Sequence, residues 1–333
     1  MSGTHQQLGS VSIDVDSTVC YRQIHGLPFP EDEADPIYEK ALPRFLDAMA
    51  NLNIKATLFV IGRDLENSAN RKIIEQAAAE GHEIANHSYL HDYALSRLPQ
   101  EDMRQDVRKA HVLIQEVTGQ APVGFRAPGY NQSEALFDVL EDLGYQYDSS
   151  FFPTPAYFAA RATAIGMYQM QKKTSHSLVG EMREFLVPPE PFFPMRNIRF
   201  KPAKLQEHAR RILEVPISVA GPARLPWLGT TLVLAPDRVG QMMTRSVLRR
   251  KQPAILELHA IDFADPQDGF EDALKTAQND LKVPLNDKLR RLENTFQEMA
   301  TQRQLVPMKK LVQSLSSVCK EKLTWLGATQ PVS

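Results

Sequence analysis

The sequence predicts an α/β fold built as a barrel of β/α units. Short apolar runs of strand length alternate with amphipathic helices through the first half of the chain, the pattern of helices packed around a parallel sheet. Polar residues with chemical function directly follow several of these runs. At 333 residues and 43% hydrophobic content, the chain can form one large core, so we expect one domain over residues 1–333.

The alternation is clearest before residue 147. Apolar runs at 11–13, 56–61 and 83–86 predict strands. Apolar residues at helical spacing predict four helices: Leu42, Phe45, Leu46 and Met49; Ile73, Ile74 and Ala77; Met103, Val107, Ile114 and Val117; Leu136, Val139, Leu140 and Leu143. Ser133 is the expected N-cap of the last one, and Gly81, Gly119 and Gly144 stand where three of them should end.

Residues 151–213 break this periodicity, and prolines accumulate there. We expect a long irregular insertion over the barrel mouth, at the C-terminal face of the strands. Six of its large apolar or aromatic residues bear on its role: Phe151, Phe152, Tyr157, Phe158, Met167 and Tyr168. These residues indicate either core packing or peripheral contact with the inner membrane.

Regular structure is expected again from residue 214. The pattern predicts a strand at 214–219, a helix at 238–250, and an apolar strand at 254–258 that runs into His259. A charged helix near 286–302, a strand at Leu305 and a helix at 308–315 complete the chain.

Composition excludes several classes of function. The 38 basic and 40 acidic residues give a net charge of -2, so no overall field attracts nucleic acid, and we expect no such partner. Cys20 and Cys319 lie far apart and lack a C-x-x-C spacing, which indicates neither a disulfide framework nor a cysteine zinc site. Residues 1–9 do not read as an export signal, and no run spans a bilayer, so we expect a cytoplasmic protein.

Asp14 and Asp16 follow the first predicted strand. A spacing of two puts both carboxylates on one side of an extended backbone, and barrels of this kind place their sites at such strand ends. A polar turn after a strand explains the pair equally well.

His87 and His91 stand four residues apart directly after the strand at 83–86. Two imidazoles with one carboxylate, for which Asp16 is the natural partner, form a set of N and O donors. Such a set suits zinc first, with cobalt, nickel, manganese or iron as alternatives. Taken singly, each histidine is more simply a packed or solvated residue.

Two further strand ends carry polar groups. Arg126 could orient a carboxylate, and the N–H of Gly129 could face a developing oxyanion. An ordinary turn with a solvated arginine is the simpler reading of that segment alone. His259 ends a late apolar strand, where a buried core histidine is the competing explanation.

Together these strand ends resemble the polysaccharide deacetylase, or NodB-homology, family of carbohydrate esterases. In its pattern an acidic strand end precedes H-S/T-x-x-H, here His87-Ser88-Tyr89-Leu90-His91, then R-x-P, here Arg126-Ala127-Pro128, then a late L-x-H strand ending at His259. The resemblance covers residues 11–150 well and 210–318 loosely. It implies a distorted (β/α) barrel.

The resemblance also implies a role for each site residue. Asp14 would be the catalytic base, Arg126 would position it, and His259 would be the acid. The metal ligands would be Asp16, His87 and His91. Gly129 would lend its amide to the oxyanion, and Tyr130 stands one place after the position where the family usually has an aromatic. Val15 separates the two aspartates, as in a subgroup of the family.

The implied reaction is hydrolysis of an N-acyl group, N-acetyl first, from an amino sugar or glycan. A bound cation lowers the pKa of water from 15.7 to about 7, so that Asp14 can take its proton while His259 protonates the leaving amine. An undecaprenyl-phosphate-linked aminosugar, deformylated or deacetylated, is the alternative substrate. A sugar-binding protein without catalysis is the alternative of another class. The sequence does not specify an oligomeric state.

Overall fold

A computed structural model describes residues 7–28, 35–157, 159, 186–204 and 208–316. Within them, parallel strands form one eight-stranded sheet in the order β11-β1-β2-β3-β4-β5-β8, with β12 also paired to β1. The strands are β1 (Leu8–Val15), β2 (Thr57–Val60), β3 (Glu83–Asn86), β4 (Gly124–Phe125), β5 (Tyr147–Asp148), β8 (Leu213–Glu214), β11 (Ala254–His259) and β12 (Gln304–Leu305).

The two ends of this sheet meet through Ser218, which follows β8. Its N–H donates to the carbonyl of Ile255 in β11 at 3.1 Å, and its Oγ accepts the N–H of Ile255 at 2.9 Å. The curled sheet is thereby closed into a distorted β/α barrel, as predicted.

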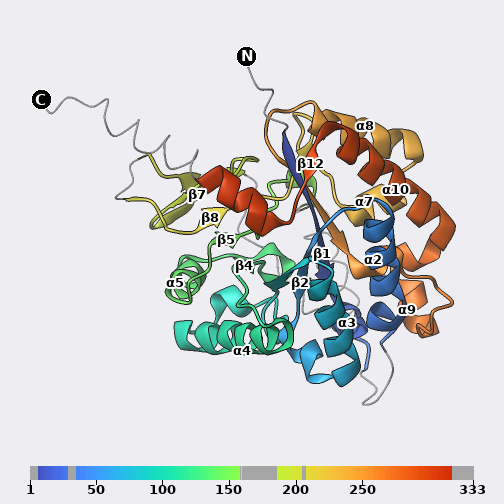
Figure 1. The fold of residues 1–333 in the computed structure, drawn as a ribbon, viewed down its shortest axis with the longest axis horizontal. Helices are drawn as coiled ribbons and strands as arrows, with labels where there is room; N and C mark the ends of the chain where they lie inside the picture. Colours follow the sequence, from blue (N-terminus) through green and yellow to red (C-terminus); the bar gives the residue numbers. More distant parts are fainter. Residues whose placement is uncertain (1–6, 29–34, 158, 160–185, 205–207, 317–333) are drawn as a thin grey trace, which may run out of the picture.

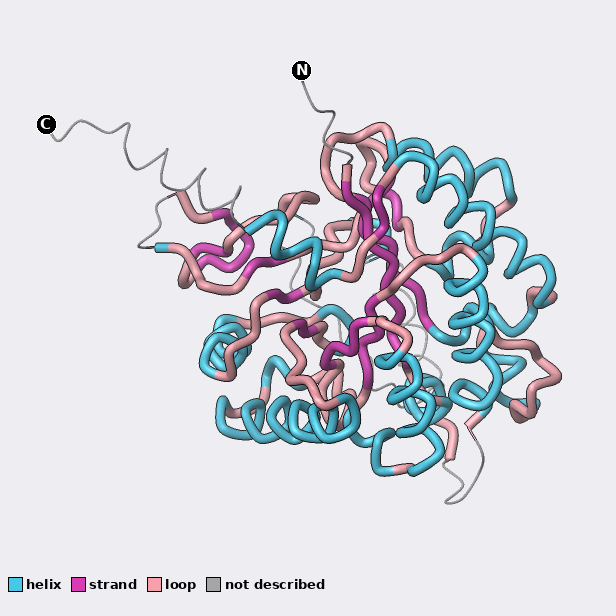
Figure 2. Tube along the Cα trace, viewed as in Figure 1, coloured by secondary structure: helices cyan, strands magenta, loops and turns pink. Residues whose placement is uncertain are grey.

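Helices cover the outside of the strands (Figures 1 and 2). Their bounds are α1 (Thr18–His25), α2 (Leu42–Asn51), α3 (Ser68–Ala79), α4 (Gln100–Thr118), α5 (Glu134–Asp142), α7 (Gly229–Leu234), α8 (Asp237–Leu248), α9 (Asp272–Ala277) and α10 (Leu285–Gln302). A π-helical turn, Ile37–Ala41, leads into α2. The Ser133 side chain caps α5 by accepting the N–H of Leu136, as the sequence predicts.

Side chains along each strand alternate between the helices and the barrel interior, because successive Cβ atoms of a strand point to opposite faces. Val11, Ile13 and Val15 of β1 pack in the core formed with the helices. Ser12 and Asp14, between them, face inward and are contacted by Arg126 from β4. This alternation places polar groups inside the barrel without opening the outer core.

The N-terminal end of the barrel is filled with apolar side chains. Met308 and Leu311, from a helix at 308–316, pack there with Phe59, Tyr147 and Ile255. With this end packed, the polar residues collect at the C-terminal end.

The expected strand at 214–219 is wrong in its extent. The structure has only β8 and, after an irregular stretch, β9 (Val219–Ala220), which pairs with β10 (Leu225–Pro226). Pro216 lacks a backbone donor. The N–H of Val215 still bonds the carbonyl of Asp148, the last residue of β5, whereas Ser218 already bonds β11, so the segment changes partner within three residues.

The insertion at 151–213 is described only in part, and residues 158 and 160–185 lie outside the described residues. Its described portion contains an antiparallel pair, β6 (Pro194–Met195) and β7 (Ile198–Pro202). Arg210 ties it to α5 through Glu134 and Asp138 at 2.5 and 2.7 Å. This portion therefore packs on α5.

Of the six apolar and aromatic residues named in the insertion, three are described, and one of them, Tyr157, is half-buried. Phe151 and Phe152 are core residues, 0% and 1% exposed, so membrane contact through these two is wrong. Phe158, Met167 and Tyr168 lie outside the described residues. Among the helices that are described, none has the length and apolar character needed to cross a membrane.

Candidate active site

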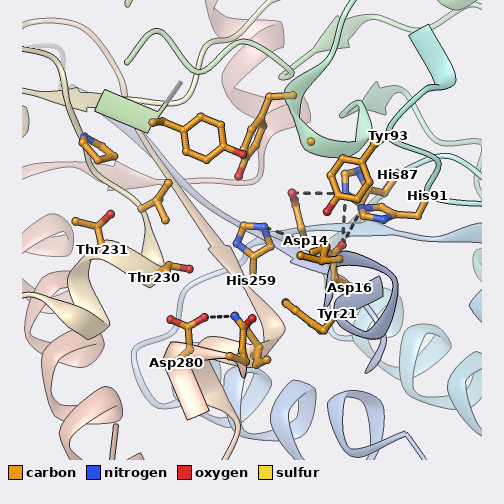
Figure 3. A pocket seen from close by; sticks show the side chains of 18 of the residues that line it. Asp14, Asp16, Tyr21, His87, His91, Tyr93, Thr230, Thr231, His259 and Asp280 are labelled. Atoms are coloured by element: carbon orange, nitrogen blue, oxygen red, sulfur yellow. Dashed lines mark hydrogen bonds and ion pairs between the residues drawn. The ribbon is translucent and has the colours of Figure 1, made fainter. Parts of the chain in front are cut away.

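Asp14 and Asp16 stand together at the C-terminal end of β1, and both line one cavity (Figure 3). They are buried, at 2% and 4% exposure. Asp14 accepts a hydrogen bond of 2.5 Å from Arg126. The predicted placement of both carboxylates on one side of the strand is confirmed.

Arg126 is fully buried beneath the site and is not solvated. Its remaining N–H groups donate to the Ser12 Oγ and to the carbonyl and Oγ of Ser149, at 3.0 to 3.1 Å. The guanidinium also lies over the ring of Phe59, 4.0 Å from its centroid. These contacts fix the guanidinium, so Asp14 is held in one orientation.

The loop from His87 to His91 is shaped by local hydrogen bonds. The Asn86 Oδ1 accepts the N–H of Ser88, whose Oγ accepts the N–H of His91. Ser88 and His91 have positive φ angles of 66° and 56°, a conformation that L residues adopt at a cost and that clusters at functional sites. The turn brings both imidazoles to the same side as Asp16.

The three predicted metal ligands lie together, with both imidazoles directed at one carboxylate oxygen of Asp16. The Nε2 atoms of His87 and His91 lie 3.5 and 3.3 Å from the Oδ1 of Asp16, which makes no hydrogen bond within the described part of the chain. The Nδ1 of His87 lies 2.8 Å from the carbonyl oxygen of Arg126. Because that oxygen can only accept, Nδ1 carries the proton and Nε2 presents its lone pair to the site.

The protonation of Asp16 and His91 suits a cation. Burial raises the pKa of Asp16, but the His91 and His87 imidazoles outweigh burial and hold this pKa well below its usual range. Burial lowers the pKa of His91 to about 4 despite the opposing effect of Asp16. An ionised carboxylate beside a neutral imidazole is the form in which these groups bind a metal.

Cys20, on α1, was not expected at this site. Its Sγ and the ligand atoms of Asp16 and His91 all lie within 4.8 Å of one another. Burial, together with Asp16, raises the pKa of the thiol well above its usual value, and the thiolate is the ligating form. Cys20 therefore packs against the candidate metal set as a neutral thiol.

His259 and Glu257 extend from β11 beside the aspartates. The Nε2 of His259 lies 4.0 Å from Asp16 and 3.5 Å from Glu257. The Oε1 of Glu257 also accepts a hydrogen bond of 2.6 Å from the hydroxyl of Tyr130. Burial lowers the pKa of His259, but Glu257, Asp16 and Asp14 together raise it to about 9. The imidazole is therefore protonated at neutral pH and can act as a proton donor.

Gly129 and Tyr130 form a left-handed turn at the cavity rim, with φ of 58° and 64°. The N–H of Tyr130 donates to the carbonyl of Ala127 at 3.0 Å, and its hydroxyl is bonded to Glu257. The N–H and the hydroxyl of Tyr130 are thus both hydrogen-bonded, and Tyr130 offers the cavity its ring.

The cavity has a volume of about 350 Å³, within the range of small-molecule sites. Besides the predicted residues, its wall contains several groups that the sequence did not identify: Tyr21, Tyr93, Tyr157, Thr230, Thr231, Gln278 and Asp280. Of the residues that sequence reasoning missed, only Glu257 carried a signal, as a charged residue within an apolar strand.

Comparison with known proteins agrees with this geometry. Residues 32–147 match the family model for polysaccharide deacetylase. Over 116 residues the chain is 32% identical to a peptidoglycan-N-acetylglucosamine deacetylase of Bacillus cereus, covering 35% of this chain and 51% of that protein. Over 152 residues it is 30% identical to a peptidoglycan deacetylase of Helicobacter pylori, covering 43% and 49%. The chain thus spans about half the length of these relatives.

A solved structure shares the fold across nearly the whole chain. It is that of a candidate polysaccharide deacetylase from Mycobacterium smegmatis, with a TM-score of 0.54 at 16% identity over 95% of this chain and 93% of that one. Asp14, Asp16 and His259 lie outside the family match, and only the fold brings them to His87, His91 and Arg126. Residues 32–147 therefore match the polysaccharide deacetylase family, and the chain as a whole has the distorted β/α barrel fold that the solved structure shares.

Proposed function

We propose that this chain is a metal-dependent amidohydrolase that removes an N-acyl group, N-acetyl first, from an amino sugar or glycan. One observation carries the proposal. The unpaired Asp16 Oδ1 lies between the His87 and His91 Nε2 atoms, next to a carboxylate, Asp14, that Arg126 holds in place.

Asp16, His87 and His91 would hold a divalent cation. Two imidazoles and one carboxylate leave coordination positions open, as in catalytic zinc sites. When bound, the ion would lower the pKa of water and polarise the substrate carbonyl. The carbonyl of Arg126 fixes the His87 imidazole, and the Ser88 Oγ holds the backbone of His91 beside it.

Asp14 would accept the proton of the attacking water. Arg126 occupies its Oδ1, and its Oδ2, 3.7 Å from the Nε2 of His87, faces the donor set. His259 would protonate the departing amine, because an amine leaves only in that form. The two groups stand on neighbouring strands, so base and acid act from adjacent positions in one cavity.

The names of the relatives support a glycan substrate. The Bacillus cereus and Helicobacter pylori proteins are described as deacetylases of peptidoglycan, and a Bradyrhizobium relative, 37% identical over 87 residues, as a chitooligosaccharide deacetylase. We propose an acetylated amino sugar of this type for this chain, handled in the cytoplasm.

The test measures metal and product on one preparation. Mass spectrometry should find one equivalent of zinc or another first-row divalent ion in the purified chain. Amine release should be seen from N-acetylglucosamine oligomers or muropeptide fragments, and should be lost with a chelator and restored by metal. Metal-free protein without amine release would favour a sugar-binding role, whereas turnover of undecaprenyl-linked sugars alone would favour the lipid-linked alternative.

A further inference from the structure

Two buried polar groups in the cavity wall have no hydrogen-bond partner among the described residues. They are the Tyr21 hydroxyl, from α1, and the Oδ1 of Asp280, which precedes α10. Their residues are 4% and 2% exposed. Buried polar groups are nearly always paired in folded proteins, so two such groups lining one cavity need an explanation.

The carboxylate of Asp280 is oriented by its other oxygen. Its Oδ2 accepts a hydrogen bond of 2.6 Å from the Nε2 of Gln278. The Oε1 of Gln278 in turn lies 3.0 Å from the Nε2 of His25. This chain of contacts fixes the side chain and leaves Oδ1 as a free acceptor. Figure 3 shows Asp280 and Tyr21 on the same side of His259, below it in the view.

The charge around Asp280 favours a neutral ligand group. Lys288 is fully buried and donates a hydrogen bond of 3.0 Å to the carbonyl of Ile261. Burial raises the pKa values of Asp280 and Asp262, and the charge of Lys288 opposes that rise. Because a buried ammonium already lies near these carboxylates, we expect the Oδ1 of Asp280 to bind a hydrogen-bond donor rather than a cation. A hydroxyl fits, because it can donate to Asp280 and accept from Tyr21.

Other walls of the cavity are aromatic. Tyr130 and Tyr157 lie with ring centroids 5.4 Å apart, and Tyr93 packs edge-on against His91 at 5.3 Å. A sugar ring has apolar C–H faces and a hydroxylated rim, and pockets of this kind combine apolar walls with a few placed polar groups. The cavity offers both surfaces to one ring.

We infer that Tyr21 and Asp280 form a subsite that binds a ring hydroxyl of the sugar whose acyl group reaches the Asp16 centre. The Tyr21 hydroxyl donates to that oxygen, and Asp280 Oδ1 accepts its proton. The identity of the ligand rests on the proposed function, but the subsite is tested by binding alone.

The experiment measures dissociation constants for N-acetylglucosamine and its 3-deoxy, 4-deoxy and 6-deoxy analogues by ligand-observed NMR. Asp280→Asn should weaken N-acetylglucosamine binding by at least ~10-fold and Tyr21→Phe by about 3- to 10-fold, the range for charged and neutral hydrogen bonds. One deoxy analogue should bind wild type about 10-fold more weakly than the parent sugar. The same analogue should bind Asp280→Asn almost as well as the parent does, because the contact is already gone.

Matched controls lie at the opposite end of the barrel. Tyr147→Phe and Glu83→Gln remove the same kinds of group from a buried pair bonded at 2.9 Å, and both should leave sugar affinity unchanged. Thermal unfolding monitored by circular dichroism verifies that each variant is folded. A purely structural role for Tyr21 or Asp280 would lower the melting temperature without altering discrimination among the deoxy analogues.

Two results would overturn the subsite: wild type that binds none of these sugars, or folded variants that keep wild-type affinity and wild-type discrimination. A chain that shows the expected binding pattern but releases no amine keeps the subsite and overturns the proposed deacetylation. The two proposals can therefore fail separately.

Discussion

Asp14 and His259 are register partners on the neighbouring parallel strands β1 and β11. Partners in a parallel pair project their side chains to the same face of the sheet, so both residues enter the cavity side by side at the C-terminal end of the barrel. A base and an acid set on paired strands are positioned by the ladder of the sheet, which holds them more rigidly than loops would.

Replacing Asp16 should abolish metal binding. In Asp16→Ala the two imidazoles remain without the carboxylate that approaches both of them. Metal affinity should fall by more than the ~10- to 100-fold expected for loss of an outer partner. Competition with a chromogenic chelator measures it, and His111→Ala, at a half-buried position of α4 outside the donor set, should retain the wild-type affinity.

Asp14→Asn should separate catalysis from metal binding. The amide keeps the shape of the side chain and can accept from Arg126, but it cannot take a proton from water. Amine release should drop by about 10² to 10⁴ while the metal content stays at the wild-type level. Full activity in this variant would remove Asp14 from the base role, and Asp47→Asn, on the exposed face of α2, is the matched control.

Removing the partner of Asp14 should destabilise the fold. Arg126→Met leaves a buried carboxylate without its cation, and breaking a buried pair in this way costs about 3–5 kcal/mol. Urea unfolding measures the loss. The double variant Asp14→Asn with Arg126→Met should recover part of it, because no unpaired charge remains. A single variant as stable as wild type would contradict the buried pairing.

His82 should make stability depend on pH. Burial, with Lys55 nearby, lowers its pKa from 6.5 to about 4 in the fold, where its Nδ1 accepts the N–H of Ala56 at 3.0 Å. Below pH 6.5 the unfolded chain therefore takes up the proton first. The contribution of the neutral ring is complete above about pH 6.5 and is lost as pH falls toward 4, by about 1–3 kcal/mol.

Unfolding free energies of wild type and His82→Gln at pH 7 and pH 5 measure this contribution. The glutamine can still accept from Ala56 but does not titrate, so its stability should change less between the two pH values. Equal changes in both proteins would assign the pH dependence to other groups.

Local sequence patterns were sufficient to predict most of the helices outside the sheet. The helices α2, α3, α4 and α5 follow from apolar residues at helical spacing, since each buries one stripe against the sheet. The sequence also predicts α8, at 238–250, and α10, as a charged helix near 286–302. The segment at 214–219 did not follow, because its hydrogen bonds go to β5 and then to β11, which no local pattern encodes. The same holds for α1, a helix with no distinctive spacing, from which Tyr21 reaches the cavity and Cys20 packs against Asp16 and His91.

The sequence alone determined the chemical types present and their order: carboxylates, two histidines, an arginine and a late histidine, each after an apolar run of strand length. The tertiary structure decided which of them meet, and it added Tyr21 and Asp280 to the cavity and Glu257 beside His259. The physical reason is that parallel strands align residues separated by more than 200 positions, such as Asp14 and His259. Burial then sets their protonation, and both effects depend on neighbours in space.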